Sequence, residues 1–227
     1  MTEPSPKERW LAALAPFVHD QMPPAPARVL EIGCGSLGGF VPSLRAAGHD
    51  AVGVDPEAPA RGAYRRLRFE EYDVQQPVDV VVACTSLHHV ADLGLVLDRA
   101  AAALVPGGTI VVIEWAHERF DEATARWGFD RLTAAGDEEG WLHDHRAEWE
   151  TSGRSWNSYL EDWAGSEGLH TGDDIIGALG RRFANRILAR APYLFSDLDN
   201  ITEADEQAAI DADQIRSTGI QYVGQRD

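Results

Sequence analysis

Residues 28 to 39 read R-V-L-E-I-G-C-G-S-L-G-G. The apolar residues Val29, Leu30 and Ile32 are followed at once by glycines, which is typical of a buried strand that enters a tight turn. Glycine suits this turn because the backbone bends sharply and a ligand can approach where no side chain stands. Residues 40 to 47 predict a helix whose N-terminal N–H groups face the turn and favour an oxygen-rich ligand.

The same pattern continues after the glycine turn. Strands are predicted at 51–54, 68–72, 78–83 and 109–113, and a helix at 57–66. A second helix follows Asp92, which is placed to cap it. Strand and helix alternate five times, which predicts an α/β fold with a doubly wound parallel sheet. Ligands bind at the carboxyl ends of such strands. The residues that end these strands are Glu31, Asp55, Asp73, Cys84 and Glu114.

The two ends of the chain add further elements to this core. Residues 5–22 predict a helix with a capping box, and residues 171–183 predict another helix. A sixth strand is predicted at 185–195 and a last strand at 220–225, with a capped helix from Thr202 between them. The predicted division is an N-terminal helix (1–27), a cofactor-binding core (28–116), a helical insertion (117–170) and a C-terminal part that completes the sheet (171–227).

The insertion is rich in tryptophan. Six of the seven tryptophans fall in or beside it: Trp115, Trp127, Trp141, Trp149, Trp156 and Trp163. One interpretation is a lid whose aromatic surface accepts an aromatic or cationic substrate. The alternative is an aromatic-rich subdomain that packs against itself.

Two nucleotide cofactors compete for the glycine turn. Gly33, Gly35 and Gly38 fit G-x-G-x-x-G, and Asp55 stands 20 residues after Gly35, as in nicotinamide-dependent oxidoreductases. Glu31 separates the two, because a dinucleotide fold normally has an apolar strand residue there. E-x-G-x-G instead resembles the first motif of class I S-adenosylmethionine-dependent methyltransferases, although the third glycine here is Gly38 rather than residue 37.

The resemblance covers residues 28 to 116 and implies a Rossmann-like seven-stranded sheet, mostly parallel, with a reversed last strand. It implies S-adenosylmethionine as cofactor, with Glu31 near its methionine end, Asp55 on the ribose hydroxyls and Asp73 on the adenine amino group. The cofactor-binding set predicted in this way is Glu31, Gly33, Cys34, Gly35, Asp55, Pro56, Asp73, Val74, Cys84 and Thr85. A non-catalytic cofactor-binding protein of the same fold is a further alternative.

The catalytic residues are less legible than the cofactor motifs, because the cofactor carries the reactive group. An oxygen nucleophile needs a base, and histidine suits that role near neutral pH. His88 and His117 leave strands at the predicted active edge, so they are the favoured candidates, with His88 facing the pocket and His89 packed beneath it. The triplet His143-Asp144-His145 lacks further recognisable metal ligands, so no metal is predicted.

Charge and composition restrict the partners. The 227 residues carry a net charge of −17, which repels nucleic acid and anionic membranes. Two cysteines are too few for a disulfide framework, the N-terminus lacks an apolar signal core, and no apolar run reaches membrane-spanning length. We therefore expect a cytoplasmic methyltransferase acting on a small molecule, most simply by O-methylation. Nothing in the sequence assigns an oligomeric state.

Overall fold

The computed structural model describes residues 4–132 and 140–227. The chain divides into two compact units. The sheet unit consists of Leu14–Glu114, His170–Ala189 and Ile220–Asp227. The aromatic unit consists of Met1–Ala13, Trp115–Leu169 and Arg190–Gly219. The aromatic unit therefore contains more than the predicted insertion, because the N-terminal segment and residues 190–219 join it.

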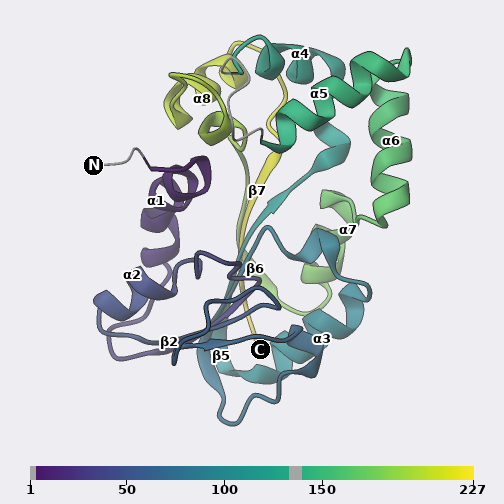
Figure 1. Ribbon diagram of the computed structural model, residues 1–227. Coiled ribbons are helices and arrows are strands. Elements are labelled where there is room, and N and C mark those ends of the chain that lie inside the picture. Colours follow the sequence, from purple (N-terminus) through teal and green to yellow (C-terminus); the bar gives the residue numbers. More distant parts are fainter. Residues whose placement is uncertain (1–3, 133–139) are drawn as a thin grey trace. The chain divides into compact units, whose positions relative to one another are not determined.

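A seven-stranded sheet in the order β3-β2-β1-β4-β5-β7-β6 forms the core of the fold (Figure 1). Its strands are β1 (Arg28–Ile32), β2 (Asp50–Val54), β3 (Tyr64–Arg65), β4 (Val78–Cys84), β5 (Leu104–Trp115), β6 (Ala184–Ala191) and β7 (Gly219–Gln225). β1 pairs in parallel with both β2 and β4, and β4 pairs in parallel with β5. The strand order reverses between β1 and β4, which is where ligands of open α/β sheets bind.

Helices α2 (Val41–Ala46), α3 (Leu93–Ala103) and α7 (Gly172–Gly180) belong to the sheet unit. α3 begins where predicted, since the Asp92 side chain accepts a hydrogen bond from Leu95 N. α7 begins with a capping box between Thr171 and Asp174. α1 (Pro6–His19) begins with the predicted capping box of Ser5 and Glu8 and continues from one unit into the other.

Among its described residues, the aromatic unit contains four further α-helices, drawn in teal, green and yellow-green in Figure 1. They are α4 (Glu122–Phe129), α5 (Trp141–Ser152), α6 (Trp156–Glu167) and α8 (Glu203–Asp211). Ser155 caps α6, and Thr202 caps α8, where the predicted capped helix is confirmed. No helix among the described residues is long and apolar enough to cross a membrane.

The segment between β2 and β4 differs from prediction. No helix forms at 57–66, because Pro56, Pro59 and Gly62 interrupt it, and two residues pair with Gly53 and Val54 as β3 instead. The strand predicted at 68–72 is a single 3-10 turn, η1 (Phe69–Glu71). The chain here lies at the edge of the sheet, where few strand hydrogen bonds are required.

Two strand ends also differ from prediction. β5 begins at Leu104 rather than Thr109, because Pro106-Gly107-Gly108 is absorbed into the strand at a register shift between Val78 and Val80 of β4. Gly107 adopts a positive φ of 76°, as an irregularity of this kind requires. β6 ends at Ala191 rather than at residue 195, immediately before Pro192, which has no N–H for a strand ladder.

Candidate functional site

The turn after β1 requires glycine at several positions. Gly33, Gly35, Gly38 and Gly39 all have positive φ, between 57° and 87°. A Cβ on Gly33 would lie 2.2 Å from Ser86 Cβ in the loop after β4. A Cβ on Gly38 would lie 2.3 Å from the hydroxyl of Tyr64 in β3. The third glycine of the motif is Gly38 rather than residue 37, and the turn forms nevertheless, because Gly38 and Gly39 both adopt positive φ.

The buried carboxylate of Glu31 connects this turn to the start of α2. Its side chain is 1% exposed, and its carboxylate accepts hydrogen bonds from the backbone N–H groups of Phe40 (2.9 Å) and Val41 (3.1 Å) at the start of α2. The positive end of the helix stabilises the buried charge. A Cβ on Gly39 would lie 1.9 Å from Glu31 Oε1, so the glycine leaves room for the carboxylate. Glu31 therefore fixes the end of the glycine turn to the start of α2.

The two other predicted acids lie on loops of the sheet unit. Asp55 follows β2 and is half-buried, and its Oδ1 accepts a hydrogen bond of 2.7 Å from Glu57 N. Pro56 beside it is exposed. Asp73 follows η1 rather than a strand, is exposed, and accepts a hydrogen bond from the Gln75 amide. With Val74 it lines a small pocket of about 210 Å³.

Glu114, the penultimate residue of β5, organises the loop after β4. It is 0% exposed and accepts hydrogen bonds from the N–H groups of Ser86 (2.7 Å) and Leu87 (2.5 Å). Its other oxygen contacts His88 Nδ1 at 2.5 Å. The carboxylate is an acceptor, so Nδ1 carries a proton. The sequence predicts that Glu114 ends a strand. Its contacts with Ser86, Leu87 and His88 depend on the pairing of β4 with β5, which local sequence does not reveal.

The predicted packing of His89 beneath His88 is wrong, because His89 is exposed. His88 is the buried member, at 4% exposure, and His89 is exposed, with their ring centroids 4.1 Å apart. Glu114 explains this arrangement, because a buried carboxylate gains most from a partner that donates a charged or strong hydrogen bond. The role of His88 as a base stays a prediction.

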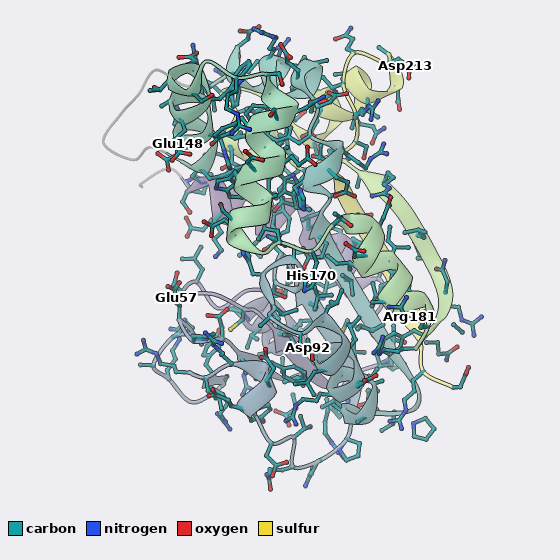
Figure 2. All side chains as sticks on the ribbon, turned by 90° about the vertical axis from the view of Figure 1, so that its right-hand side faces the viewer. Glu57, Asp92, Glu148, His170, Arg181 and Asp213 are labelled. Atoms are coloured by element: carbon teal, nitrogen blue, oxygen red, sulfur yellow. The ribbon has the colours of Figure 1, made fainter. Side chains whose placement is uncertain are left out.

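His170 also contacts the loop after β4, although in the chain it stands at the end of the insertion. Its backbone N–H donates to His88 O at 3.0 Å, and its ring Nε2 contacts Val90 O at 2.8 Å. Figure 2 labels it near Asp92, the cap of α3. A residue 82 positions after His88 has no local signal that would reveal such a contact.

Both cysteines are buried and form no disulfide, Cys34 in the glycine turn and Cys84 at the end of β4. Cys34 Sγ lies 2.7 Å from where a Cβ would stand on Gly53 of β2. Thr85, which follows Cys84, has a positive φ of 46° and is half-buried. These residues therefore stand at the carboxyl ends of β1 and β4, which are neighbours in the sheet.

The tryptophans of the insertion form a local core. Trp115 and Trp156 are buried, and Trp127, Trp141, Trp149 and Trp163 are partly buried against the same cluster. Trp156 packs edge-on against Phe120 and Phe129. Self-packing thus accounts for most of the aromatic surface. His117 is also buried, with its ring edge-on to Trp115 at 5.9 Å. Among the described residues no group of three metal-ligating side chains occurs.

The chain is similar to known proteins in both sequence and structure. Residues 7–164 match the family model described as a methyltransferase domain. A ubiquinone biosynthesis O-methyltransferase of Nitrobacter winogradskyi is 38% identical over 94 residues, which cover 36% of this chain and 36% of that protein. The match thus spans about a third of the length of this curated relative.

Solved structures share the fold over nearly the whole chain. An S-adenosylmethionine-dependent methyltransferase from Mesorhizobium loti is similar with a TM-score of 0.57 and 19% identity, over 95% of this chain and 100% of that one. A geranyl diphosphate C-methyltransferase from Streptomyces coelicolor, solved with S-adenosylhomocysteine, has a TM-score of 0.53 and 16% identity over 95% and 76%. The predicted fold class is confirmed. The chain belongs to the methyltransferase-domain family, the class I S-adenosylmethionine-dependent methyltransferases.

Proposed function

We propose that this protein transfers the methyl group of S-adenosylmethionine to an oxygen atom of a small molecule. The observation that carries the proposal is the 94-residue match to relatives named ubiquinone biosynthesis O-methyltransferase. The family match favours methyl transfer over the nicotinamide-dependent alternative. The match spans about a third of the length of these relatives.

The glycine turn fits the proposed cofactor. Four residues of positive φ let the backbone pass close to a ligand, and added methyl groups would collide with Ser86, Tyr64 or Glu31. We assign Gly33, Gly35 and Cys34 to the turn around the methionine end, with Glu31 setting its shape. Asp55 would hold the ribose hydroxyls and Asp73 the adenine amino group. Pro56, Val74, Cys84 and Thr85 would complete the walls.

The cofactor, when bound, supplies an electrophilic methyl group on a sulfonium. The residues of this chain then have to orient the acceptor and remove its proton. His88 and His117 remain the predicted bases. His88 donates from Nδ1 to Glu114, so its Nε2 would be the atom that takes a proton.

The net charge of the chain is consistent with a small-molecule acceptor. A net charge of −17 disfavours polyanionic acceptors and suits neutral or cationic ones. Two cysteines that form no disulfide support a reducing compartment, and we place the protein in the cytoplasm. We also propose that the insertion at 117–170 contributes to acceptor binding, although most of its aromatic surface lies in its own core.

Titration calorimetry tests the cofactor assignment. We expect S-adenosylhomocysteine to bind and NAD to give no heat of binding. The reverse result would restore the oxidoreductase interpretation. Turnover with labelled S-adenosylmethionine on phenols, amines and carboxylates then tests the acceptor. Methylation of phenols alone supports the proposal, methylation of amines alone overturns the oxygen assignment, and binding without any turnover indicates a non-catalytic protein.

A further inference from the structure

The loop after β4 contacts the glycine turn directly. Ser86 Oγ donates a hydrogen bond of 3.2 Å to the carbonyl oxygen of Ile32, the last residue of β1. Ser86 Cβ stands 2.2 Å from the position that a Cβ on Gly33 would take, so the loop occupies the space that this glycine leaves. All three residues belong to the sheet unit. A movement of the loop would therefore move one wall of the turn that we assign to the cofactor.

A strained backbone at Thr85 gives this loop its shape. Thr85 has a φ of 46°, a left-handed conformation that is unfavourable for a β-branched residue. Its N–H still donates to Ile113 O of β5 at 2.8 Å, so the strand ladder continues up to this residue. Ser86 returns to a negative φ of −129°. A change in the sign of φ between neighbouring residues directs successive N–H groups to the same side, where they form a concavity that binds an anion.

The carboxylate of Glu114 occupies this concavity. Its Oε1 accepts hydrogen bonds from the N–H groups of Ser86 and Leu87, and its Oε2 contacts His88 Nδ1. A buried carboxylate requires donors that replace water, and these three groups supply them. The same bonds offset the backbone strain at Thr85. Without Glu114, two buried N–H groups would lose their acceptor and the loop would relax.

His170 holds the loop from a second element. Its backbone N–H donates to His88 O at 3.0 Å, and its ring Nε2 donates to Val90 O at 2.8 Å. The loop is therefore bonded to the end of β5 through Glu114 and to the segment before α7 through His170. Bonds of this kind fix the loop before any cofactor arrives, so a ligand does not have to order it.

We propose that Glu114 is a positioning residue with two separable roles. Through Ser86 it holds the glycine turn in the form that binds S-adenosylmethionine, and through Oε2 it keeps a hydrogen on His88 Nδ1. This inference rests on the assignment of the glycine turn to the cofactor in the proposed function. It adds a residue of β5 that lies outside the cofactor motifs, and its test requires no methyl acceptor.

Two substitutions of Glu114 separate the two roles. In Glu114→Gln the amide oxygen has to face the N–H groups of Ser86 and Leu87, because those backbone groups can only donate. The amide nitrogen then faces His88 Nδ1 as a donor, so Nδ1 has to accept and the hydrogen of a neutral His88 moves to Nε2. Glu114→Met, which is unbranched and of similar length, removes both roles.

Nitrogen NMR of histidine-labelled, cofactor-free protein tests the second role. The signals of His88 are assigned by their loss in His88→Gln. At about pH 8, where an ordinary histidine is neutral, wild-type His88 should carry a hydrogen on Nδ1. In Glu114→Gln, Nδ1 should carry none and Nε2 should carry one. A wild-type Nδ1 without hydrogen, or an Nδ1 that keeps its hydrogen in Glu114→Gln, would overturn this role.

Calorimetry with S-adenosylhomocysteine tests the first role. Glu114→Met should weaken binding by about 10- to 100-fold, because only the fraction of molecules with an ordered loop binds. Glu114→Gln keeps the bonds to the loop and should bind within about threefold of wild type. Ser86→Ala keeps the Cβ but loses the bond to Ile32, and should weaken binding by about three- to tenfold. Adding Glu114→Met to Ser86→Ala should cost less than it costs in wild type, because both act through one contact.

Glu206→Met is the matched control, because Glu206 is a buried carboxylate of the aromatic unit that also accepts backbone N–H bonds. It should bind S-adenosylhomocysteine within about twofold of wild type. Equal losses in Glu206→Met and Glu114→Met would overturn the first role, as would unchanged binding in Ser86→Ala, which decides the matter even if Glu114→Met does not fold. A wild-type protein that does not bind S-adenosylhomocysteine would instead overturn the cofactor assignment of the proposed function.

Discussion

The glycine turn of the sheet unit and the aromatic core of the insertion stabilise themselves by different physics. At the turn, four positive-φ glycines and one buried carboxylate fix the backbone, so a single added methyl group collides with a neighbour. In the aromatic unit, ten buried residues share one core of packed side chains. The glycine turn could therefore be predicted from neighbouring residues in the sequence. The packing of the aromatic core could not, because it depends on side chains that are far apart in the chain.

The largest effect is expected from the aromatic core. Trp156 is fully buried and its indole N–H donates to Phe120 O. Trp156→Ala should reduce the free energy of unfolding by about 3–5 kcal/mol, because it leaves a cavity and an unpaired carbonyl. Urea unfolding measures this. The exposed neighbour Asn157→Ala is the matched control, and an equal loss in both variants would refute a packing origin.

At the glycine turn, the equivalent change is one methyl group. Gly39→Ala places a Cβ 1.9 Å from Glu31 Oε1 at a φ of 57°, so we expect a loss of about 2–4 kcal/mol of stability and weaker binding of S-adenosylhomocysteine. Gly62→Ala, where no atom lies within 4 Å, is the control. If both variants bind the cofactor product equally well, the turn does not depend on glycine.

An Asp55 variant tests whether the loop after β2 binds the ribose hydroxyls of the cofactor. Asp55→Ala should weaken S-adenosylhomocysteine binding by about 2–4 kcal/mol, or roughly 30- to 1000-fold, through the loss of charge-assisted hydrogen bonds. Calorimetry gives the dissociation constant. Glu57→Ala removes a neighbouring exposed carboxylate, labelled in Figure 2, and should bind as wild type does. An unchanged constant in the Asp55 variant would remove this residue from the site.

The stability of the aromatic unit should depend on pH. Burial raises the pKa of Glu206 from 4.5 to about 6, although its carboxylate accepts hydrogen bonds from Tyr193 N and Phe195 N. The protonated form is favoured by folding. Its contribution, about 2 kcal/mol, is therefore fully present below pH 4.5 and lost as the pH rises through 6.

Glu206→Gln should flatten the dependence of unfolding free energy on pH between 4.5 and 6.5. Asp213→Asn, at an exposed position with a φ of 53° that asparagine tolerates, should keep the wild-type slope. Identical slopes in all three proteins would assign the pH dependence to other groups.

The smallest effect is expected at the solvent face of α5. Glu150 pairs with Arg146 at 3.0 Å, one turn away, and both side chains are largely exposed. Glu150→Gln should change stability by less than about 0.5 kcal/mol, and less still in high salt. A loss above about 1 kcal/mol in urea unfolding would mean that surface charge, and not packing, holds the aromatic unit.

The sequence determined the fold class, the family and the cofactor-edge motifs. Val29 to Gly39 carries its signal locally, because a strand entering a glycine turn is set by neighbouring residues and by the φ that only glycine adopts readily. The caps at Asp92 and Thr202 could be predicted for the same reason, since a capping side chain contacts an N–H three residues away.

Only the tertiary structure decided which side chains meet over long separations. Glu114 reaches His88 across the pairing of β4 with β5, which buried His88 and exposed His89. The bridge from Glu148 through Tyr159 to His145 joins two helices, and His170 reaches the loop after β4 from 82 residues away. Local composition does not encode such contacts, because they depend on the register of strands and the packing of helices that the whole chain establishes together.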